Sequence, residues 1–288
     1  MPVLKDIRRK IKAIQNTQKI TKAMKMVAAA KLRKVQTRML NFRQYADKIH
    51  EVTVRLATGA ERQLHPLLMV RPRETVEVIV MSGDRGLCGS FNSNIIKAGA
   101  NYINDLRKNG FEVSVSTIGR RGRDYFKRRN IQLRKSWTGV SGDLIYNTAQ
   151  EISNDIIENY INETIDEVTL IYNEFKSVIA QKVTVAKLLP LGTIEAGEEA
   201  AGGSDILYEP SQEVIFERLL PKNVEIQIYR ALLESSAAEE AARMSAMENA
   251  SQNCDDLIAR TTLVYNKARQ TLITKELMDI VGCVEALK

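Results

Sequence analysis

Two long stretches of this 288-residue sequence lack both glycine and proline, the residues that most often interrupt a helix. The first covers residues 3–58 and is rich in Lys, Arg, Ala, Met, Gln and Leu, and the second covers residues 222–281. Each stretch predicts one uninterrupted helix, about 80 Å long at the N-terminus and about 90 Å long at the C-terminus. A compact domain of this size cannot enclose such helices, so we expect them to project from it.

Residues that bind metals or act as nucleophiles are scarce. Cys88, Cys254 and Cys283 are the only cysteines, and their wide spacing lacks the close pairs of zinc sites or disulfide frameworks. This usage predicts a reducing compartment. His50 and His65 are the only histidines and have no Cys or acid at ligand spacing, so we expect ordinary surface or interface residues. For Cys88 we expect a small buried residue rather than a reactive thiol.

Long hydrophobic runs are also missing. No segment approaches the roughly 18 to 20 apolar residues that cross a bilayer, and the first ten residues lack the apolar stretch of a signal peptide. The sequence therefore predicts a soluble chain. Acidic residues are scattered, and no set of Ser, His and Asp is readable. We expect no catalytic, cofactor-binding or metal-binding residue.

Acidic residues are nearly absent from the N-terminal segment. Residues 1–43 hold 13 Lys or Arg against the single acid Asp6, whereas residues 44–210 carry a net charge of −2 and residues 211–288 a net charge of −3. The formal net charge of +7 therefore comes entirely from the first helix. We expect this basic stripe to point toward water or an acidic partner.

Both predicted helices carry a coiled-coil seam, in which steps of four and three residues alternate on the first helix and the spacing is near-heptad on the second. On the first helix the seam is Ile7, Ile11, Ile14, Gln18, Thr21, Lys25, Ala28, Leu32 and Val35. On the second it is Ile258, Thr261, Tyr265, Ala268, Leu272, Lys275 and Met278. Because the chain between them must fold and return, we predict an antiparallel coiled coil of the N- and C-terminal helices, with loose pairing where the seam is polar.

The middle of the chain predicts an α/β domain, because strand-like and helix-like segments alternate. Expected strands are residues 75–81, 111–118, 168–175 and 176–188, and expected helices are residues 92–108, 123–129 and 143–162. This order favours a Rossmann-like domain with a mainly parallel sheet. The acidic, glycine-rich residues 191–205 predict a mobile surface loop. The resulting division is 1–58, 59–210 and 211–288.

A glycine-rich turn, residues 83–89, follows the first expected strand. A dinucleotide site is one interpretation, because such turns and helix N-termini suit phosphates. The spacing is G-x-x-G-x-x-G rather than G-x-G-x-x-G, and no P-loop Lys accompanies it. A tight strand-to-helix turn uses glycines anyway, so we favour a structural role.

A basic cluster spans residues 120–134, with Tyr125 and Phe126 inside it. A nucleic-acid surface is conceivable. A solvated helix face within an assembly is the favoured interpretation, because no nucleic-acid motif accompanies the cluster. The basic members are Arg120, Arg121, Arg123, Lys127, Arg128, Arg129 and Arg134.

Three separated segments resemble the ATP synthase gamma subunit family: DIRRKIKAIQNTQKITKAMKMVAAAKLRK (6–34), SGDRGLCGSFN (82–92) and YNKARQTLITKELMDIVGCVEAL (265–287). LYEPS (207–211) and AARMSAMENA (241–250) fit the same family. The resemblance implies a non-catalytic subunit, the central rotor shaft of a proton-translocating F-type ATP synthase. Its coiled coil would stand inside a hexamer of alternating alpha and beta subunits, with the α/β domain at the foot near the c-ring and the epsilon subunit.

The resemblance also implies contact residues. Met24 and Lys25 match contacts with the moving beta-subunit lever, and Lys25 stands where some relatives have an acid. Tyr208 and Glu209 match contacts with the c-ring. Ser90 stands where Gly is frequent. The contacts with the beta-subunit catch loop match Arg269, Gln270 and Thr274.

A chloroplast-type cysteine insertion and an organellar transit peptide are not evident, so a bacterial enzyme at the cell membrane, peripheral on its cytoplasmic side, is expected. A shaft that turns against its neighbours is expected to present polar and small residues rather than apolar anchors. No nucleic acid and no small-molecule substrate are expected. Two alternatives stay open: a nucleic-acid-binding scaffold using the basic helix, and a nucleotide-dependent enzyme using the turn at Gly83.

Overall fold

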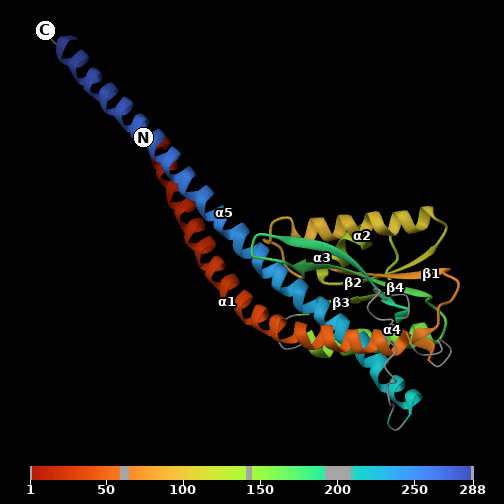
Figure 1. Ribbon diagram of the computed structural model, residues 1–288. Helices are drawn as coiled ribbons and strands as arrows, with labels where there is room; N and C mark the ends of the chain where they lie inside the picture. Colours follow the sequence, from red (N-terminus) through yellow and green to blue (C-terminus); the bar gives the residue numbers. More distant parts are fainter. Residues whose placement is uncertain (1, 59–64, 141–144, 192–208, 210, 287–288) are drawn as a thin grey trace. The chain divides into compact units, whose positions relative to one another are not determined.

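A computed structural model describes residues 2–58, 65–140, 145–191, 209 and 211–286 (Figure 1). The chain divides into two compact units, and each is described by itself. The first consists of Met1–Ala28 and Met244–Lys288, and the second of Ala29–Arg243. The two long helices, α1 (Pro2–Thr58) and α5 (Gln212–Ala286), contribute to both units.

Both long helices are confirmed, but α5 begins ten residues before the predicted start and runs through Pro221. A proline inside a helix removes one backbone donor and costs about 3 kcal/mol. Here Phe216, Leu220 and Val224 are all fully buried on either side of it. Burial of each such side chain contributes about 1.5–3 kcal/mol, which offsets the proline. The prediction ended at Pro221 because local propensity does not register this packing.

In the first unit, α1 and α5 run antiparallel. The Gln18 amide donates to the Asp255 carboxylate, and Lys25 pairs with Glu248, so lower numbers on α1 meet higher numbers on α5. Thr21 is buried in the predicted seam, and the other α1 seam residues of this unit are half-buried or buried. The antiparallel pairing is therefore confirmed, and it includes the polar middle of the seam.

The predicted α5 seam ends early. Residues from Ile258 to Leu272 on the seam are half-buried, but Lys275 and Met278 are exposed. The register set by Gln18 and Asp255 explains the difference: α1 begins at Pro2, so the part of α5 beyond Leu272 has no α1 residue opposite it. The seam prediction for Lys275 and Met278 was wrong because heptad spacing does not say where the partner helix ends.

The second unit contains the α/β fold. Within the described residues its sheet has the strand order β3-β2-β1-β4-β5, in which β5 alone runs antiparallel to its neighbour. The strands are β1 (Thr75–Met81), β2 (Glu112–Ile118), β3 (Lys135–Trp137), β4 (Glu167–Phe175) and β5 (Gln181–Leu189). The mainly parallel sheet is confirmed. The short edge strand β3 was not predicted.

Helices cover both faces of this sheet (Figure 1). They are α2 (Phe91–Lys108), α3 (Arg120–Arg128) and α4 (Ile145–Ile161), with a 3₁₀ turn η2 (Pro66–Leu68). On β1, Val76, Val78 and Val80 face α2, whereas Glu77 faces α4 through its ion pair with Arg134. The alternation follows from the two-residue period of a strand. The expected start of α4 at residue 143 lies outside the described residues, as does the expected loop 191–205 except for Leu191, which is buried.

His65 is a correction to the sequence prediction. It is buried, and its Nδ1 accepts the backbone N–H of Leu67 at 3.2 Å, which caps η2. Burial lowers the pKa of this imidazole, in keeping with a neutral ring that can accept. His50 is half-buried, and burial lowers its pKa as well. A histidine cap at a 3₁₀ turn has no clear sequence signal beyond the following proline.

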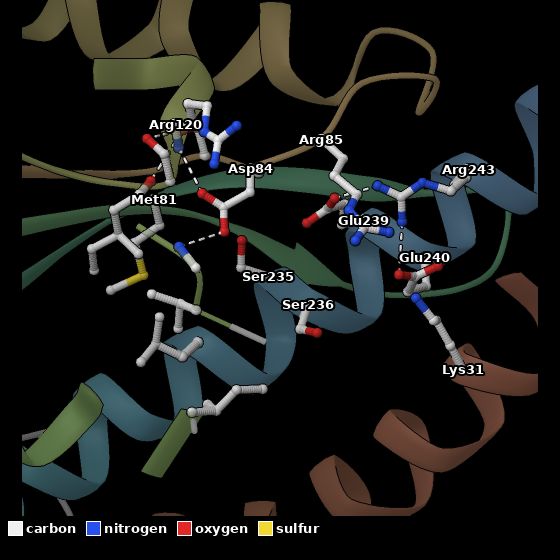
Figure 2. A pocket seen from close by; sticks show the side chains of 18 residues that line it. Lys31, Met81, Asp84, Arg85, Arg120, Ser235, Ser236, Glu239, Glu240 and Arg243 are labelled. Atoms are coloured by element: carbon white, nitrogen blue, oxygen red, sulfur yellow. Dashed lines mark hydrogen bonds and ion pairs between the residues drawn. The ribbon is translucent and has the colours of Figure 1, made fainter. Parts of the chain in front are cut away.

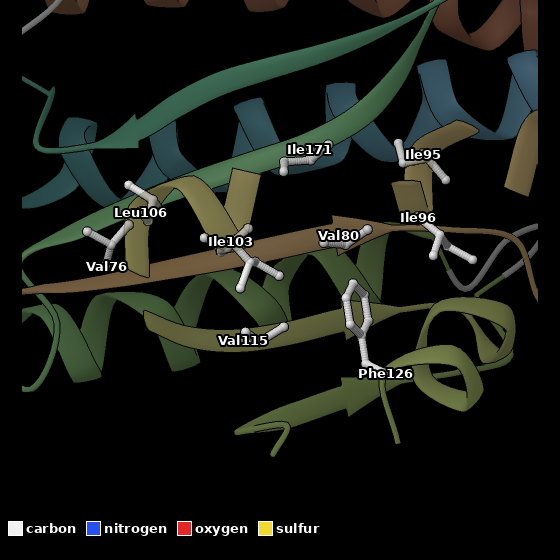
Figure 3. Packing of buried hydrophobic residues seen from close by; sticks show 10 residues of the cluster. Val76, Val80, Ile95, Ile96, Ile103, Leu106, Val115, Phe126 and Ile171 are labelled. Atoms are coloured by element: carbon white, nitrogen blue, oxygen red, sulfur yellow. The ribbon is translucent and has the colours of Figure 1, made fainter. Parts of the chain in front are cut away.

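The core between α2 and the sheet should determine the stability of the second unit (Figure 3). Ile103 is fully buried there, against the β1 valines. We expect Ile103→Ala to lower the free energy of unfolding by about 2–5 kcal/mol, because it removes apolar contacts and leaves a cavity. Urea unfolding measures this. The matched control is Ile179→Ala, since Ile179 is 91% exposed and its loss should stay within about 0.5 kcal/mol. Equal losses would contradict the assignment of the core.

Candidate functional site

The glycine-rich turn after β1 is held by the ends of the neighbouring strands. Ser82 N–H donates to the Ile118 carbonyl at 2.8 Å, and Ser82 Oγ accepts the N–H of Gly122 at 2.8 Å. The Asp84 carboxylate accepts the backbone N–H groups of Arg120 at 2.9 Å and Gly139 at 2.8 Å. Asp84 thereby joins the loops that follow β1, β2 and β3.

Two glycines permit close approaches at this turn. Gly119 has φ +92°, and a Cβ there would lie 2.0 Å from the carbonyl oxygen of Ser82. At Gly83 a Cβ would lie 2.8 Å from the carboxyl carbon of Glu239 on α5. These glycines therefore serve packing between the turn, the strand ends and α5. A phosphate site is not needed to explain them.

A cavity of about 370 Å³ lies at this turn, inside the second unit. Its walls are the ends of β1 and β2, the segment after β3, and α5, with Lys31 from α1 (Figure 2). The crevice at the carboxyl ends of parallel strands is where open α/β sheets usually bind ligands. In this chain α5 lies along that crevice.

Carboxylates dominate the α5 side of the cavity. Figure 2 shows the Arg243 guanidinium directed at both Glu239 and Glu240, and its Nη1 lies 2.7 Å from Glu240 Oε1. Burial raises the pKa of Glu239, and the neighbouring Arg243 opposes that rise. With Asp84 across the cavity, three carboxyl groups face a space that a phosphate would need. Four basic residues, Lys31, Arg85, Arg120 and Arg243, line the same cavity, so charge alone does not decide whether an anion could bind there.

Cys88 lies in the same turn and is buried, as predicted. Burial raises the pKa of its thiol, with a further contribution from Glu239. A thiol with a raised pKa is less nucleophilic at neutral pH. The described residues contain no group of side chains suited to hold a metal ion.

The basic cluster divides into exposed and partly buried members, and Arg123 is partly buried and pairs with Asp124 at 2.9 Å. Arg120, Arg121, Lys127, Arg128 and Arg129 are exposed, which agrees with a solvated helix face. Arg134 is different: its side chain is 24% exposed, and it bonds Glu77 at 3.1 Å and Asp155 at 2.7 Å. The prediction that Arg134 belongs to a solvated face was therefore wrong, because the fully buried Glu77 on β1 requires a counter-ion.

The expected lever contacts lie together on α1, in the first unit. Met24 is half-buried. Lys25 has a partner within the chain, Glu248 on α5, and both side chains remain about two-fifths exposed, at 42% and 38%. An exposed pair of this kind contributes about 0–1 kcal/mol, so it can open easily. Sequence reasoning missed Glu248, although it is one of the few acids opposite the basic helix.

The expected catch-loop contacts Arg269, Gln270 and Thr274 are exposed on α5. The Thr274 hydroxyl donates to the Gln270 carbonyl at 2.9 Å, so it is already bonded within the helix. About 30 Å of helix separate Arg269 from Glu248, so the two expected contact sites are distinct places on the first unit. Glu209 is exposed, and Tyr208 lies outside the described residues.

Large apolar side chains stand exposed near the end of α5, which sequence reasoning missed. Leu277, Met278, Ile280 and Val281 are each at least half exposed. The expectation of a polar and small surface was wrong for this end of the helix. The signal was present in the sequence, because Leu277, Ile280 and Val281 lie outside the heptad stripe that includes Met278. A contiguous exposed apolar surface marks an interaction site.

Comparisons with known proteins agree along the whole chain. A family model described as ATP synthase matches residues 3–287. The ATP synthase gamma chain of Anaeromyxobacter sp. (strain K) is 47% identical, with 100% of both chains covered. That of Syntrophus aciditrophicus (strain SB) is also 47% identical and covers 100% of this chain and 99% of its own. This chain belongs to the ATP synthase gamma chain family.

Solved structures support the same fold. The central stalk and c-ring structure of Tetrahymena thermophila mitochondrial ATP synthase contains a chain 30% identical to this one, with a TM-score of 0.60, covering 81% of this chain and 99% of that chain. A chain of the Euglena gracilis mitochondrial ATP synthase has a TM-score of 0.69 over 99% of this chain and 95% of its own; its 19% identity shows the fold alone.

As a gamma chain, the protein is the central-stalk subunit of an F-type ATP synthase, a non-catalytic subunit of the complex. The cavity at the glycine-rich turn then belongs to the joint where α5 packs against the α/β fold, rather than to an active site. No described helix has the length and apolar character of a membrane span.

Gly119 tests the packing of this joint in the gamma chain. Gly119→Ala should lower the free energy of unfolding by several kcal/mol, since a positive φ costs about 1–2 kcal/mol and overpacking adds about 1–3 kcal/mol. The matched control is Gly110→Ala. Gly110 has φ +86°, and a Cβ added there would meet open space, so this variant should show the backbone cost alone. Chemical denaturation of both variants gives the comparison. A Gly119 loss no larger than the Gly110 loss would refute the close approach.

Proposed function

We propose that this chain couples rotation of the c-ring to conformational change at the alpha and beta catalytic sites, on the cytoplasmic side of a bacterial membrane. Its partners are the alpha and beta subunits, the epsilon subunit and the c-ring. The observation that carries the proposal is the first unit, a two-helix coiled coil whose outer surface is basic, exposed and in part apolar. Neither nucleic acid nor a small-molecule substrate enters this role.

The proposal divides the chain into shaft segments 1–58 and 211–288 and a foot, 59–210. The foot would meet the ring through Tyr208 and Glu209. Each orientation of the shaft would present a different face to three chemically identical beta subunits. A face that contacts one beta conformation better than another shifts that subunit's equilibrium and its nucleotide affinity.

The charge pattern supports an acidic partner around the N-terminal helix. The side chains of Arg9 and Asp6 are 72% and 67% exposed, and most other basic residues of this helix are exposed as well. Lys25 is held by Glu248 when no partner engages it. Because that pair is weak, Lys25 can exchange Glu248 for a lever carboxylate at little cost.

The exposed apolar side chains near the end of α5 support the proposal that partner subunits enclose this helix. Exposed Leu277, Met278, Ile280 and Val281 would lie against water in an isolated chain, and burial of each is worth about 1.5–3 kcal/mol. A ring of alpha and beta subunits would cover them. These contacts are non-directional, so they can hold the helix without favouring one angle.

Arg269 and Gln270 test the catch-loop contact. Arg269→Ala with Gln270→Ala should assemble with alpha and beta yet show markedly lower ATP turnover and proton pumping, because charge-assisted hydrogen bonds worth about 1.5–3 kcal/mol are lost. The control is Arg260→Ala, an exposed arginine nine residues earlier and so on the opposite side of the helix. Thr274→Ala should have the smaller effect, since its hydroxyl bonds within α5. Normal turnover of the intact double variant would sink this assignment.

The foot contact is tested by crosslinking in the assembled complex. Tyr208→Cys and Glu209→Cys should capture the c subunit, because the resemblance places both against the ring. The background carries Cys283→Ser, since Cys283 is exposed and would react too. Ala23→Cys, exposed beside Met24 on α1, is the control and should capture alpha or beta. Capture of alpha or beta alone from position 208 or 209 would refute the foot placement.

A further inference from the structure

A fully buried carboxylate on α5 contacts two other elements of the second unit. The Glu234 side chain is 1% exposed. Its Oε1 accepts from Arg43 Nη2 on α1 at 2.8 Å, and its Oε2 accepts the backbone N–H of Phe175, the last residue of β4, at 3.1 Å. Glu234 therefore bonds α5 to α1 and to the sheet at the same time.

A second arginine extends this cluster. Arg230, one turn earlier on α5, has its Nε 3.7 Å from Glu234 Oε1 and its Nη1 2.7 Å from Asp47 on α1. We call Arg43, Asp47, Arg230 and Glu234 the Glu234 clasp. Its two ion pairs between α1 and α5 lie one helical turn apart, so they resist both sliding and relative rotation of the helices.

The Glu234 end of the clasp is poorly hydrated, whereas the Asp47 side chain at its other end is 56% exposed. Burial raises the pKa of the nearby Tyr172 to about 12, and the Glu234 charge adds to the rise. In such surroundings an unpaired carboxylate is costly, and charge-assisted hydrogen bonds are strong and directional. Apolar packing between the same elements has no preferred direction. The bonds of Glu234 to Arg43 and Phe175 therefore give the contact between these elements a defined direction.

Two other buried carboxylates have arginine partners and lie elsewhere: Glu167 on β4 pairs with Arg73 at 2.7 Å, and Glu77 belongs to a larger network. Glu77 on β1 and Asp155 on α4 share Arg134, and all three belong to the α/β fold. That network stabilises the sheet and α4 without an ion pair to α1 or α5. Among the ion pairs of the described residues given above, the buried carboxylate that links both long helices to the sheet is thus Glu234.

We propose that Glu234 is the positioning residue that transmits twist between the α/β fold and the two long helices. The inference rests on the proposed function, because twist matters only if the chain turns as a shaft. Torque on the sheet loads the bond from Phe175 to Glu234, which is itself part of α5, and the bond from Arg43 to Glu234 passes the load to α1. Without the carboxylate, the joint keeps its apolar packing but loses its directional bonds.

The test uses the assembled ATP synthase carrying Glu234→Gln, which keeps the size of the side chain and removes its charge. A bead attached through Lys108→Cys on α2, whose side chain is 78% exposed, reports thermal angular fluctuations against an immobilised head. We expect the angular variance to rise about twofold and protons pumped per ATP hydrolysed to fall about twofold, since one ionic partner of a charge-assisted joint is lost. ATP hydrolysis should continue.

The matched control is Glu51→Gln. Glu51 is also ion-paired, to Lys48 and Arg55, but all three lie on α1, so its loss should leave variance and coupling at wild-type values. Arg43→Gln removes only the α1 bond and carries the test if Glu234→Gln fails to assemble. Wild-type variance in an assembled Glu234→Gln or Arg43→Gln complex would overturn the inference. Failure of the proposed function is distinguishable, because wild type and Glu51→Gln would then show no ATP-driven rotation either.

Discussion

The close approach between α5 and the glycine turn after β1 is the contact on which the second unit depends. Glu239 lies against Gly83, and Asp84 bonds the loops after β2 and β3. These contacts occupy the edge of the sheet where related topologies bind ligands. A helix of the same chain therefore takes the place of a ligand. The α/β fold therefore holds α5 in place. Gly83, which suggested phosphate binding, is explained by its close approach to Glu239 on this helix.

Ion pairs that join different elements of the chain differ in burial, although exposed pairs such as Lys48 with Glu51 also occur in the second unit. In the second unit, Glu77 and Glu234 are buried and bonded by arginines, which makes their geometry costly to change. In the first unit, Lys25 and Glu248 are exposed and their pair contributes little. Rigidity is thus concentrated where the α/β fold holds the helices. Adaptable contacts lie where neighbouring subunits would be engaged.

Local sequence features predicted the elements well and their surroundings poorly. The absence of glycine and proline predicted α1, and β-branched runs predicted β1 and β4, because backbone propensity determines these features. Passage of α5 through Pro221 depends on buried Phe216 and Leu220, which are tertiary contacts. The burial of Arg134 and Glu234 likewise depends on partners distant in sequence. The resemblance implied that Arg269 and Gln270 are contact residues. The contacts of Glu239, Glu248 and the clasp join positions distant in sequence, so only the structure reveals them.

The first unit has two kinds of cross-section, because α1 begins at Pro2 and lies beside only part of α5. Up to Leu272, α5 has α1 beside it, and two parallel cylinders together have an oval outline. Beyond Leu272, α5 is a single helix with an almost round outline and exposed apolar side chains. When an oval body turns in a close-fitting ring, it pushes each side in succession, as a cam does. A round body turns without pushing, as an axle does in its bushing. Within the described residues, the position where α1 begins therefore sets where the first unit changes from a two-helix to a single-helix cross-section.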